Sequence, residues 1–386
     1  MSSGVRVLVV TNDFPPRVGG INDYVHQLVR RLAPGSVTVL TSTYPGAAAF
    51  DATFPQRVVR QPVRMLLPTP AVLAAASRLV VAERPDVILF GAAAPLALMG
   101  ATLRRRHGVP YIACTHGFEL VATRLPPGGV FLRRLGRTAA AVTVVSRYVR
   151  ERLMPFLEGG CRVELLPSGI DATRFHPAVT ADDVRRRHAL GADPTIVCVS
   201  RLVPRKGQDH LIRVLPRLAD EFPNVRLLIV GDGRYKRTLR RLTACLGLER
   251  RVVFAGEVRY ELLPAYFRAA DVFAMPCRSR FGGLEVEGLG AVFLQAAAVG
   301  RACVAGRSGG APEAVRHGET GLVVDGTDLD ELATALLTLL RDPARAQTMG
   351  AAGAAWVHGA LTWDHMAVRL RDLLTTCAGV HGGGHT

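Results

Sequence analysis

The stretch FAMPCRSRFGGLEVEGLGAVFLQ, residues 273–295, decides the fold of this chain. It begins as an apolar strand, expected over residues 272–275, and breaks at Pro276. A polar loop with glycines follows, and a helix of small residues is expected from about Glu287. Open α/β sheets bind ligands in loops of this kind, because the N–H groups at a helix start lack partners and attract anions. The stretch therefore predicts a ligand-binding α/β fold.

Strand and helix signals alternate along the whole chain, which is typical of parallel sheets covered by helices on both faces. A Pro-Ser-Gly turn at residues 167–171 interrupts the alternation and is interpreted as a linker. We predict two facing doubly wound, Rossmann-like domains, residues 1–170 and 171–355, and a segment 356–386 whose helix crosses back to the first domain before a loose tail, HGGGHT. The expected strands cover residues 5–11, 37–41, 87–90, 111–114, 141–145, 163–166, 195–200, 225–230, 252–254, 272–275, 302–304 and 321–323.

Composition favours an intracellular globular protein. The 386 residues are 49% hydrophobic, which is enough for two domains with full cores. The seven cysteines include no C-x-x-C pair, so neither a disulfide framework nor a metal site is expected, and a reducing cytoplasm fits best. No charged and then apolar leader precedes the first strand, and the longest uncharged run, residues 87–103, contains two glycines and a proline. We therefore expect no transmembrane segment.

The net charge of +16 is concentrated in the first half, where residues 1–170 contain 20 arginines and 9 acidic residues. Clusters at residues 104–106, 133–137 and 147–152 would attract anionic lipid headgroups, each base contributing about 1 kcal/mol near such a surface. Under this interpretation the protein lies peripherally at the inner face of the cell membrane. The alternative is that arginine is a compositional habit and these are solvated helix faces. No aromatic residues interleave with the arginines, so no nucleic-acid binding is expected.

Two loops of the first half are candidates for ligand contact. Gly19 and Gly20 stand just before an expected helix, where bare backbone donors suit a phosphate or sugar, although a tight turn would use them equally well. The spacing lacks G-x-G-x-x-G, so a dinucleotide is not expected. His116 follows the strand at residues 111–114 and is placed to hydrogen-bond a substrate, with Glu119 orienting it. The alternative is a loop histidine satisfied by backbone groups.

The segment SRLVPRKGQD, residues 200–209, opens the second half with three cations. Arg201 and Lys206 bracket a turn that ends at Gly207, so both can converge on one diphosphate. Arg205 is interpreted as facing water.

Glu287 and Gln295 lie eight positions apart in the opening stretch. On one helix this is a little over two turns, so both side chains would lie on nearly one face about 12 Å apart, a span that fits the two ends of a nucleotide sugar. Glu287 would alternatively be a helix cap, favoured by the helix dipole by about 0.3–1 kcal/mol. Gly231 and Gly233, after the strand at residues 225–230, would admit a nucleotide or form a tight turn.

Together these residues resemble the retaining glycosyltransferases of family 4, which have the GT-B fold. The resemblance covers nearly the whole chain, because TNDFPPRVGGI, THGFE, SRLVPRKG, VGDG, FAGEV, the opening stretch and GRSGGAPEAV occur in the family's order and spacing. Within the family, NDFPP, MPCR and EVEGLG are most similar to the GDP-mannose-dependent phosphatidylinositol monomannoside mannosyltransferases.

The resemblance implies an enzyme that moves mannose from GDP-mannose onto a phosphatidylinositol mannoside-type lipid with retention of configuration. It implies that residues 1–170 bind the acceptor and residues 171–355 the nucleotide sugar. No metal cluster is visible in the sequence, so no metal or other cofactor is expected and the cations would do a metal's work. The implied donor-binding residues are Gly19, Gly20, Arg201, Lys206, Gly231, Gly233, Val258, Glu287, Gly288, Leu289 and Gln295. Asn12 and Asp13 are the implied acceptor ligands, and His116, Arg201, Lys206 and Glu287 the catalytic residues.

Two positions depart from the family's pattern. The family usually has glutamate at the position of Gln295, where it receives ribose hydroxyls. Hydrogen bonds to charged groups contribute about 1.5–3 kcal/mol against about 0.5–1.5 kcal/mol for neutral ones, so donor binding is expected to weaken about tenfold or more. Phe118 replaces a histidine of the most similar relatives, which bears on the acceptor. The alternatives are a glycosyltransferase for a soluble glycoside or natural product, and a non-catalytic protein that binds sugar nucleotides.

Overall fold

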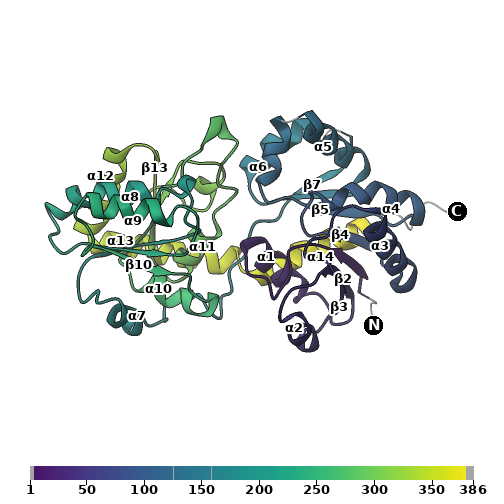
Figure 1. Ribbon diagram of the computed structural model, residues 1–386, viewed down its shortest axis with the longest axis horizontal. Helices are drawn as coiled ribbons and strands as arrows, with labels where there is room; N and C mark the ends of the chain where they lie inside the picture. The colour runs from purple at the N-terminus through teal and green to yellow at the C-terminus, as the bar shows by residue number, and fades with distance from the viewer. Residues whose placement is uncertain (1–3, 125, 158, 380–386) are drawn as a thin grey trace. The chain divides into compact units, whose positions relative to one another are not determined.

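The structure is a computed structural model that describes residues 4–124, 126–157 and 159–379 and divides the chain into two compact units. Unit 1 comprises Met1–Ser168 with Trp363–Thr386, and unit 2 comprises Gly169–Thr362 (Figure 1). The expected tail HGGGHT lies outside the described residues. Within the described part of the chain, no helix combines the length and the apolar character needed to cross a membrane.

Unit 1 contains a seven-stranded sheet with the strand order β3-β2-β1-β4-β5-β6-β7, in which all neighbours run parallel. Every residue of the central strand β1 is buried, as expected for a sheet covered on both faces. The chain order reverses between β1 and β4, and open sheets bind ligands at the carboxyl ends of the strands at such a point. The strands are β1 (Val7–Val10), β2 (Val37–Ser42), β3 (Arg57–Gln61), β4 (Val87–Phe90), β5 (Tyr111–Cys114), β6 (Ala141–Val144) and β7 (Arg162–Leu165).

The helices of unit 1 include one from the far end of the chain, α14, which packs against α1. Arg31 at the end of α1 donates a hydrogen bond to Asp364 of α14 over 2.7 Å. The helices are α1 (Gly20–Val29), α2 (Ala47–Thr53), α3 (Pro70–Glu83), α4 (Gly100–His107), α5 (Pro126–Thr138), α6 (Arg147–Leu153) and α14 (Trp363–Gly379), with 3-10 turns at Leu96–Met99, Phe118–Arg124 and Met154–Phe156.

Unit 2 repeats the design with a six-stranded parallel sheet in the order β10-β9-β8-β11-β12-β13, whose order reverses between β8 and β11. The prediction of two doubly wound parallel α/β domains is confirmed. The strands are β8 (Thr195–Val199), β9 (Arg226–Val230), β10 (Val252–Gly256), β11 (Val272–Met275), β12 (Ala302–Gly306) and β13 (Gly321–Val324).

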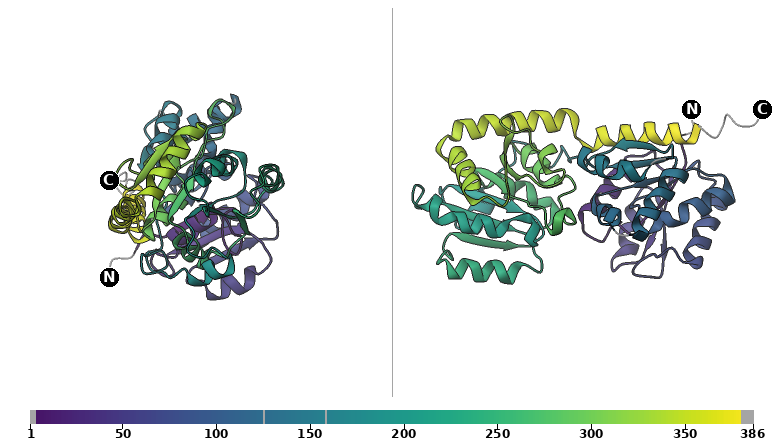
Figure 2. Two further views of the ribbon diagram at one scale, coloured as in Figure 1. Left: turned by 90° about the vertical axis from the view of Figure 1, so that its left-hand side faces the viewer. Right: turned by 90° about the horizontal axis from the view of Figure 1, so that it is seen from above.

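The helices of unit 2 cover this sheet, and Figure 2 shows the longest of them, α13, running along one side of the unit, where it packs on α11 and β12. The helices are α7 (Asp182–Arg187), α8 (Gln208–Ala219), α9 (Lys236–Cys245), α10 (Leu263–Arg268), α11 (Ala291–Ala298), α12 (Leu329–Arg341) and α13 (Pro343–Ala360). Short 3-10 helices lie at Pro204–Lys206, Tyr260–Leu262, Phe281–Gly283 and Ala311–Glu313.

Polar side chains define several helix starts. The Thr69 hydroxyl accepts a hydrogen bond from the Val72 N–H at the start of α3, which has Pro70 as its first residue. Ser146 caps α6 in the same way, and Asp328 accepts from two N–H groups of α12. These local contacts explain why the helix signals of the sequence correspond to helices.

One strand and one domain limit differ from those expected. β3 was not among the predicted strands, because it is an edge strand of sequence RVVRQ whose residues are exposed or half-buried, so it lacks an apolar run. The expected domain limit between residues 355 and 356 falls inside α13, which continues to Ala360. The units divide at 168/169 and 362/363 instead, because α13 packs along its length on elements of unit 2.

Candidate functional site

In unit 2 the loops after β8 and β11 bring two cations to one carboxylate. After β8 the chain forms the 3-10 helix Pro204–Lys206 and turns at Gly207, whose φ of 79° is the left-handed conformation that glycine adopts easily. The Lys206 Nζ and an Arg205 guanidinium nitrogen each lie 2.6 Å from the same Glu287 oxygen, Oε2. Lys206 and Glu287 are both buried. Lys206 and Glu287, which the resemblance assigns to the donor, therefore meet within this unit.

The cations keep Glu287 ionised. Burial alone would raise the pKa of this carboxyl, but Lys206 and Arg205 hold its pKa below the ordinary value of 4.5. A lysine has three N–H donors and an arginine five, so both side chains retain donors for phosphate oxygens while they bind Glu287. The arrangement suits a ligand that has hydroxyl groups beside a diphosphate.

The interpretation of Arg205 as a solvent-facing residue is wrong. Arg205 is half-buried and binds Glu287, which is 82 residues away in the sequence. The sequence spacing relates Arg205 only to the neighbouring cations, so it did not indicate the contact with Glu287. The useful signal was that Arg205 shares one tight turn with Lys206.

A second loop, after β12, fixes the backbone of Glu287. The Gly310 N–H donates to the Glu287 carbonyl over 2.8 Å, and the Ser308 hydroxyl accepts from the Glu287 N–H over 3.4 Å. A Cβ on Gly309 would lie 2.0 Å from the Glu287 carbonyl oxygen, so only glycine fits there. The GRSGG segment resembles the family's pattern, but its role in fixing Glu287 was not predicted from the sequence.

Glu287 does not belong to the helix that follows it. Gly290 has φ 85°, and α11 begins at Ala291, so the prediction that Glu287 and Gln295 share one helix is wrong and Glu287 is not a cap. Gly288 and the buried Leu289 lie in the loop between. Gln295 is in the second turn of α11 and is 9% exposed.

Arg201 lines a cavity of about 440 Å³ beside this cluster, together with Arg205 and Gly233. The other lining residues are Val203, Asp232, Arg234 and Glu285. Gly231 and Gly233 pack closely on the loop after β8, because Cβ atoms there would lie 2.1 Å from the Ser200 carbonyl oxygen and 2.4 Å from that of Leu202. These glycines therefore serve the loop packing itself. Val258 is half-buried and follows β10.

A buried ion pair joins the loop after β11 to the start of α8. The Arg278 guanidinium donates two parallel hydrogen bonds to Asp209, of 3.0 and 2.8 Å, and both side chains are largely buried. The Arg278 backbone N–H donates to the Arg205 carbonyl over 2.8 Å. This pair thus ties the loop after β11 to the turn that carries Arg205 and Lys206.

In unit 1, His116 follows β5 and reaches the end of β4. Its Nε2 lies 2.8 Å from the Gly91 carbonyl oxygen, which can only accept, so Nε2 carries the proton. Burial lowers the pKa of His116 to about 4, so the ring is neutral near pH 7 and its Nδ1 is a hydrogen-bond acceptor. The Tyr24 ring packs edge-on against the imidazole at 5.0 Å between centroids.

The expectation that Glu119 orients the His116 ring is wrong. Oε2 of Glu119 accepts hydrogen bonds from the backbone N–H groups of His116 and Gly117, both of 3.0 Å. Oε1 is buried and has no partner among the described residues. Burial raises the pKa of Glu119 to about 7, against these backbone hydrogen bonds. Glu119 therefore shapes the loop, and the Gly91 carbonyl orients the ring.

The loop after β1 holds the remaining candidates. Asn12 uses its side-chain amide on the backbone of Leu66, donating over 2.9 Å and accepting over 2.6 Å, so its visible role is structural. Burial raises the pKa of Asp13, against the opposing effect of Arg17. α1 begins at Gly20, where a Cβ would meet nothing within 4 Å.

Gly19 completes this loop. A Cβ on Gly19 would meet only the end of the Asn22 side chain, at 2.8 Å. Packing within the chain therefore does not require glycine at either position, and ligand approach stays the prediction for both. Within the described ranges no group of three potential metal ligands occurs.

Solved structures with this architecture identify the fold. HepE from Anabaena, crystallised with UDP and glucose, superposes with a TM-score of 0.80 at 21% identity and covers 96% of this chain and 100% of its own. Sucrose-phosphate synthase from Thermosynechococcus elongatus superposes equally well at 23% identity, over 97% and 100%. The fold is that of the GT-B glycosyltransferases, as predicted.

Sequence relatives specify the family. Glycosyltransferase Family 4 matches residues 18–174, and Glycosyl transferases group 1 matches residues 181–356. The GDP-mannose-dependent alpha-(1-6)-phosphatidylinositol monomannoside mannosyltransferase of Mycolicibacterium smegmatis is 47% identical over 96% of this chain and 98% of its own length. A mannosyltransferase of the same kind, for the monoacylated acceptor, from Corynebacterium glutamicum is 44% identical over 97% and 99%. The chain belongs to glycosyltransferase family 4 and is an enzyme of that class.

Proposed function

We propose that this glycosyltransferase moves mannose from GDP-mannose onto a phosphatidylinositol monomannoside, with retention of configuration. Support comes from relatives with that activity in their names, which match at 44–47% identity over nearly the full length of both chains. The observation in the molecule that carries the proposal is the buried Glu287 carboxylate held by Lys206 and Arg205.

Stabilising the departing diphosphate is the main task of such a site. As the glycosidic bond breaks, negative charge grows on the GDP and positive charge on the hexose ring. Preorganised cations beside the diphosphate stabilise that charge and are worth more in a buried site than in water. We assign this role to Lys206, Arg205 and the more exposed Arg201, with Arg201 and Arg205 lining the cavity.

Two side chains that accept hydrogen bonds are assigned to the hexose. The ionised Glu287 binds sugar hydroxyls, and its fixed backbone keeps it in place without reorganisation. The Nδ1 of neutral His116 accepts from another hydroxyl of the transferred mannose. The acceptor hydroxyl attacks from the face that the diphosphate leaves, and a donor phosphate oxygen takes its proton.

The remaining roles follow the family pattern. The donor's nucleotide is assigned to Gln295 and to the loops of Gly231, Gly233 and Val258. In addition to Glu287, the backbone of Gly288 and Leu289 is assigned to the donor's sugar. Gly19 and Gly20 are assigned to the diphosphate, and Asp13 to the acceptor, with Asn12 holding its loop.

Transfer of radiolabelled mannose tests the proposal directly. Purified protein is incubated with GDP-mannose and phosphatidylinositol monomannoside, and the lipid product is analysed for the anomeric configuration of the new linkage. We expect an α-mannoside, and loss of turnover in Glu287→Ala but not in Glu319→Ala, an exposed acid of the same unit. If mannose were transferred to a soluble glycoside and to no lipid of a membrane extract, the acceptor would be a soluble glycoside. No turnover at all would remove the proposal.

Membrane contact is a separate part of the proposal. Arginines of α4 and α5 in unit 1 are exposed, namely Arg105, Arg106, Arg133, Arg134 and Arg137. We propose that they hold the protein at an anionic bilayer that contains its lipid acceptor. Co-sedimentation with phosphatidylinositol vesicles, but not with phosphatidylcholine vesicles, is the expected result, and equal sedimentation with both would contradict it.

A further inference from the structure

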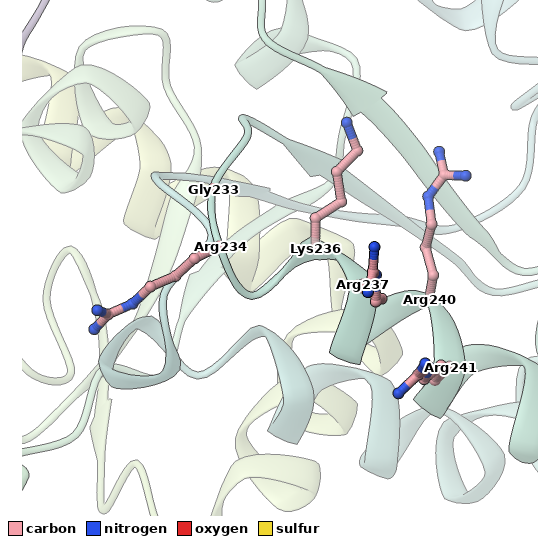
Figure 3. Close-up of a pocket in the computed structure, with 6 residues that line it drawn as sticks. All are labelled: Gly233, Arg234, Lys236, Arg237, Arg240 and Arg241. Carbon is pink, nitrogen blue, oxygen red and sulfur yellow. The ribbon is translucent and has the colours of Figure 1, made fainter.

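A second cavity of unit 2, about 560 Å³ in volume, is lined by five cations and one glycine (Figure 3). We call it the α9 cavity, and its lining residues are Gly233, Arg234, Lys236, Arg237, Arg240 and Arg241. The helix α9, KRTLRRLTAC, contains four of these cations and no acid. They stand at i, i+1, i+4 and i+5, which places them on adjacent turns of one broad face. Figure 3 shows Lys236 and Arg240 extending on the same side of the helix.

The cations of the α9 cavity are only partly neutralised. Lys236 pairs with Asp232 at 2.5 Å, and Arg234 lies 3.9 Å from Glu285. Arg240 lies over the Phe254 ring at 5.5 Å. Among the residues that the structure describes, no acid is within ion-pair distance of Arg237 or Arg241.

Two other exposed arginines of this unit are paired, Arg217 with Asp330 and Arg341 with Glu221. Arg237 and Arg241 differ from them in standing on adjacent turns of a helix that contains no acid. Like charges on neighbouring turns repel, and a bound anion removes that repulsion.

We propose that the α9 cavity binds the phosphate groups of an anion other than the sugar donor, an inference that goes beyond the transferase activity. Arginine guanidinium groups offer forked donors that match phosphate oxygens. The α9 cavity shares Gly233 and Arg234 with the cavity that contains Arg201 and Arg205. An anion in the α9 cavity would compete for Arg234, so its binding would be coupled to that of the donor. The phosphate can come from a free phosphorylated metabolite or from a lipid headgroup.

Calorimetric titration with inorganic diphosphate tests the proposal. The protein is first saturated with GDP, whose own titration reports on the donor site, so failure of the proposed function is seen separately. We expect the GDP-saturated protein to bind one further diphosphate, with an affinity that falls as salt rises. In Arg237→Gln/Arg241→Gln this binding should weaken about tenfold or more, since each substitution removes charge-assisted hydrogen bonds to the anion. GDP binding should remain.

The matched control is Arg186→Gln/Arg187→Gln, which removes two adjacent exposed arginines from α7 of the same unit. Sedimentation with phosphatidylcholine vesicles, with and without phosphatidylinositol, identifies the source. If only Arg237→Gln/Arg241→Gln loses diphosphate binding, the ligand is a free anion. If only this variant loses binding to the phosphatidylinositol vesicles, the ligand is a lipid headgroup. The proposal would be overturned if the GDP-saturated protein bound neither diphosphate nor the vesicles. Equal losses of binding in the two double variants would also overturn it.

Discussion

Glu119→Gln should make unit 1 more stable above neutral pH and have little effect in acid. The Glu119 carboxyl is buried, its Oε1 has no partner among the described residues, and Oε2 accepts the N–H groups of His116 and Gly117. A glutamine keeps an oxygen for these two donors but removes the ionisation. The carboxylate is the form that the buried environment penalises.

The magnitude follows from the pKa of Glu119, which burial raises from 4.5 to about 7 in the folded protein. The folded state then binds the proton more tightly than the unfolded chain. The native enzyme therefore loses stability as the pH rises between these two values, and its stability stays low above them. One pKa unit corresponds to about 1.4 kcal/mol, so the loss is about 3 kcal/mol. His116, whose pKa of about 4 is below its ordinary value, lowers stability in acid instead, but it is present in both proteins and cancels in the difference.

Tryptophan fluorescence during urea unfolding measures this difference in unit 1 alone. The chain contains two tryptophans, Trp356 in unit 2 and the buried Trp363 in unit 1, so Trp356→Phe leaves one reporter. Trp363 lies 5.7 Å from the Tyr24 ring, which packs on His116. In this background the unfolding free energy of the Gln variant minus that of the parent should rise by about 3 kcal/mol from about pH 4.5 to above pH 7. A difference independent of pH would refute the reasoning, as would the same profile in Glu164→Gln, a half-buried acid of β7.

Three further changes test the donor site. Lys206→Ala should lower kcat about 100- to 1000-fold, because it removes a preorganised cation from the departing diphosphate. As the pH falls, the variant should also lose the stability contributed by the ionised Glu287 at a higher pH than the parent does. Unchanged single-turnover rates would contradict this role. Asp209→Asn should raise the KM for the donor and destabilise the protein by about 3–5 kcal/mol, because it leaves Arg278 buried without its partner. Steady-state kinetics measure the KM, and thermal unfolding measures the stability. Gln295→Glu should tighten GDP binding about tenfold in calorimetry, since a charged acceptor replaces a neutral one, and unaltered affinity would show that this residue does not reach the nucleotide.

Local signals in the sequence predicted much of the fold. Strand and helix periodicity and the turns at glycine and proline are local properties, so the central strands were placed within a residue or two, and the alternation fixed two parallel sheets. Since the carboxyl ends of parallel strands lie at one edge of a sheet, the loops of His116, Lys206 and Glu287 were recognised as ligand loops before their neighbours were known.

Only the tertiary structure decided which side chains meet. Arg205 and Lys206 are equivalent cations in the sequence, and their common partner Glu287 is more than 80 residues away. The start of α11 depended on the left-handed Gly290, and Glu119 was found to hold a backbone, not a ring. Contacts of this kind depend on the packing of distant segments and on the desolvation that follows, and neither is encoded in the spacing of residues along the chain.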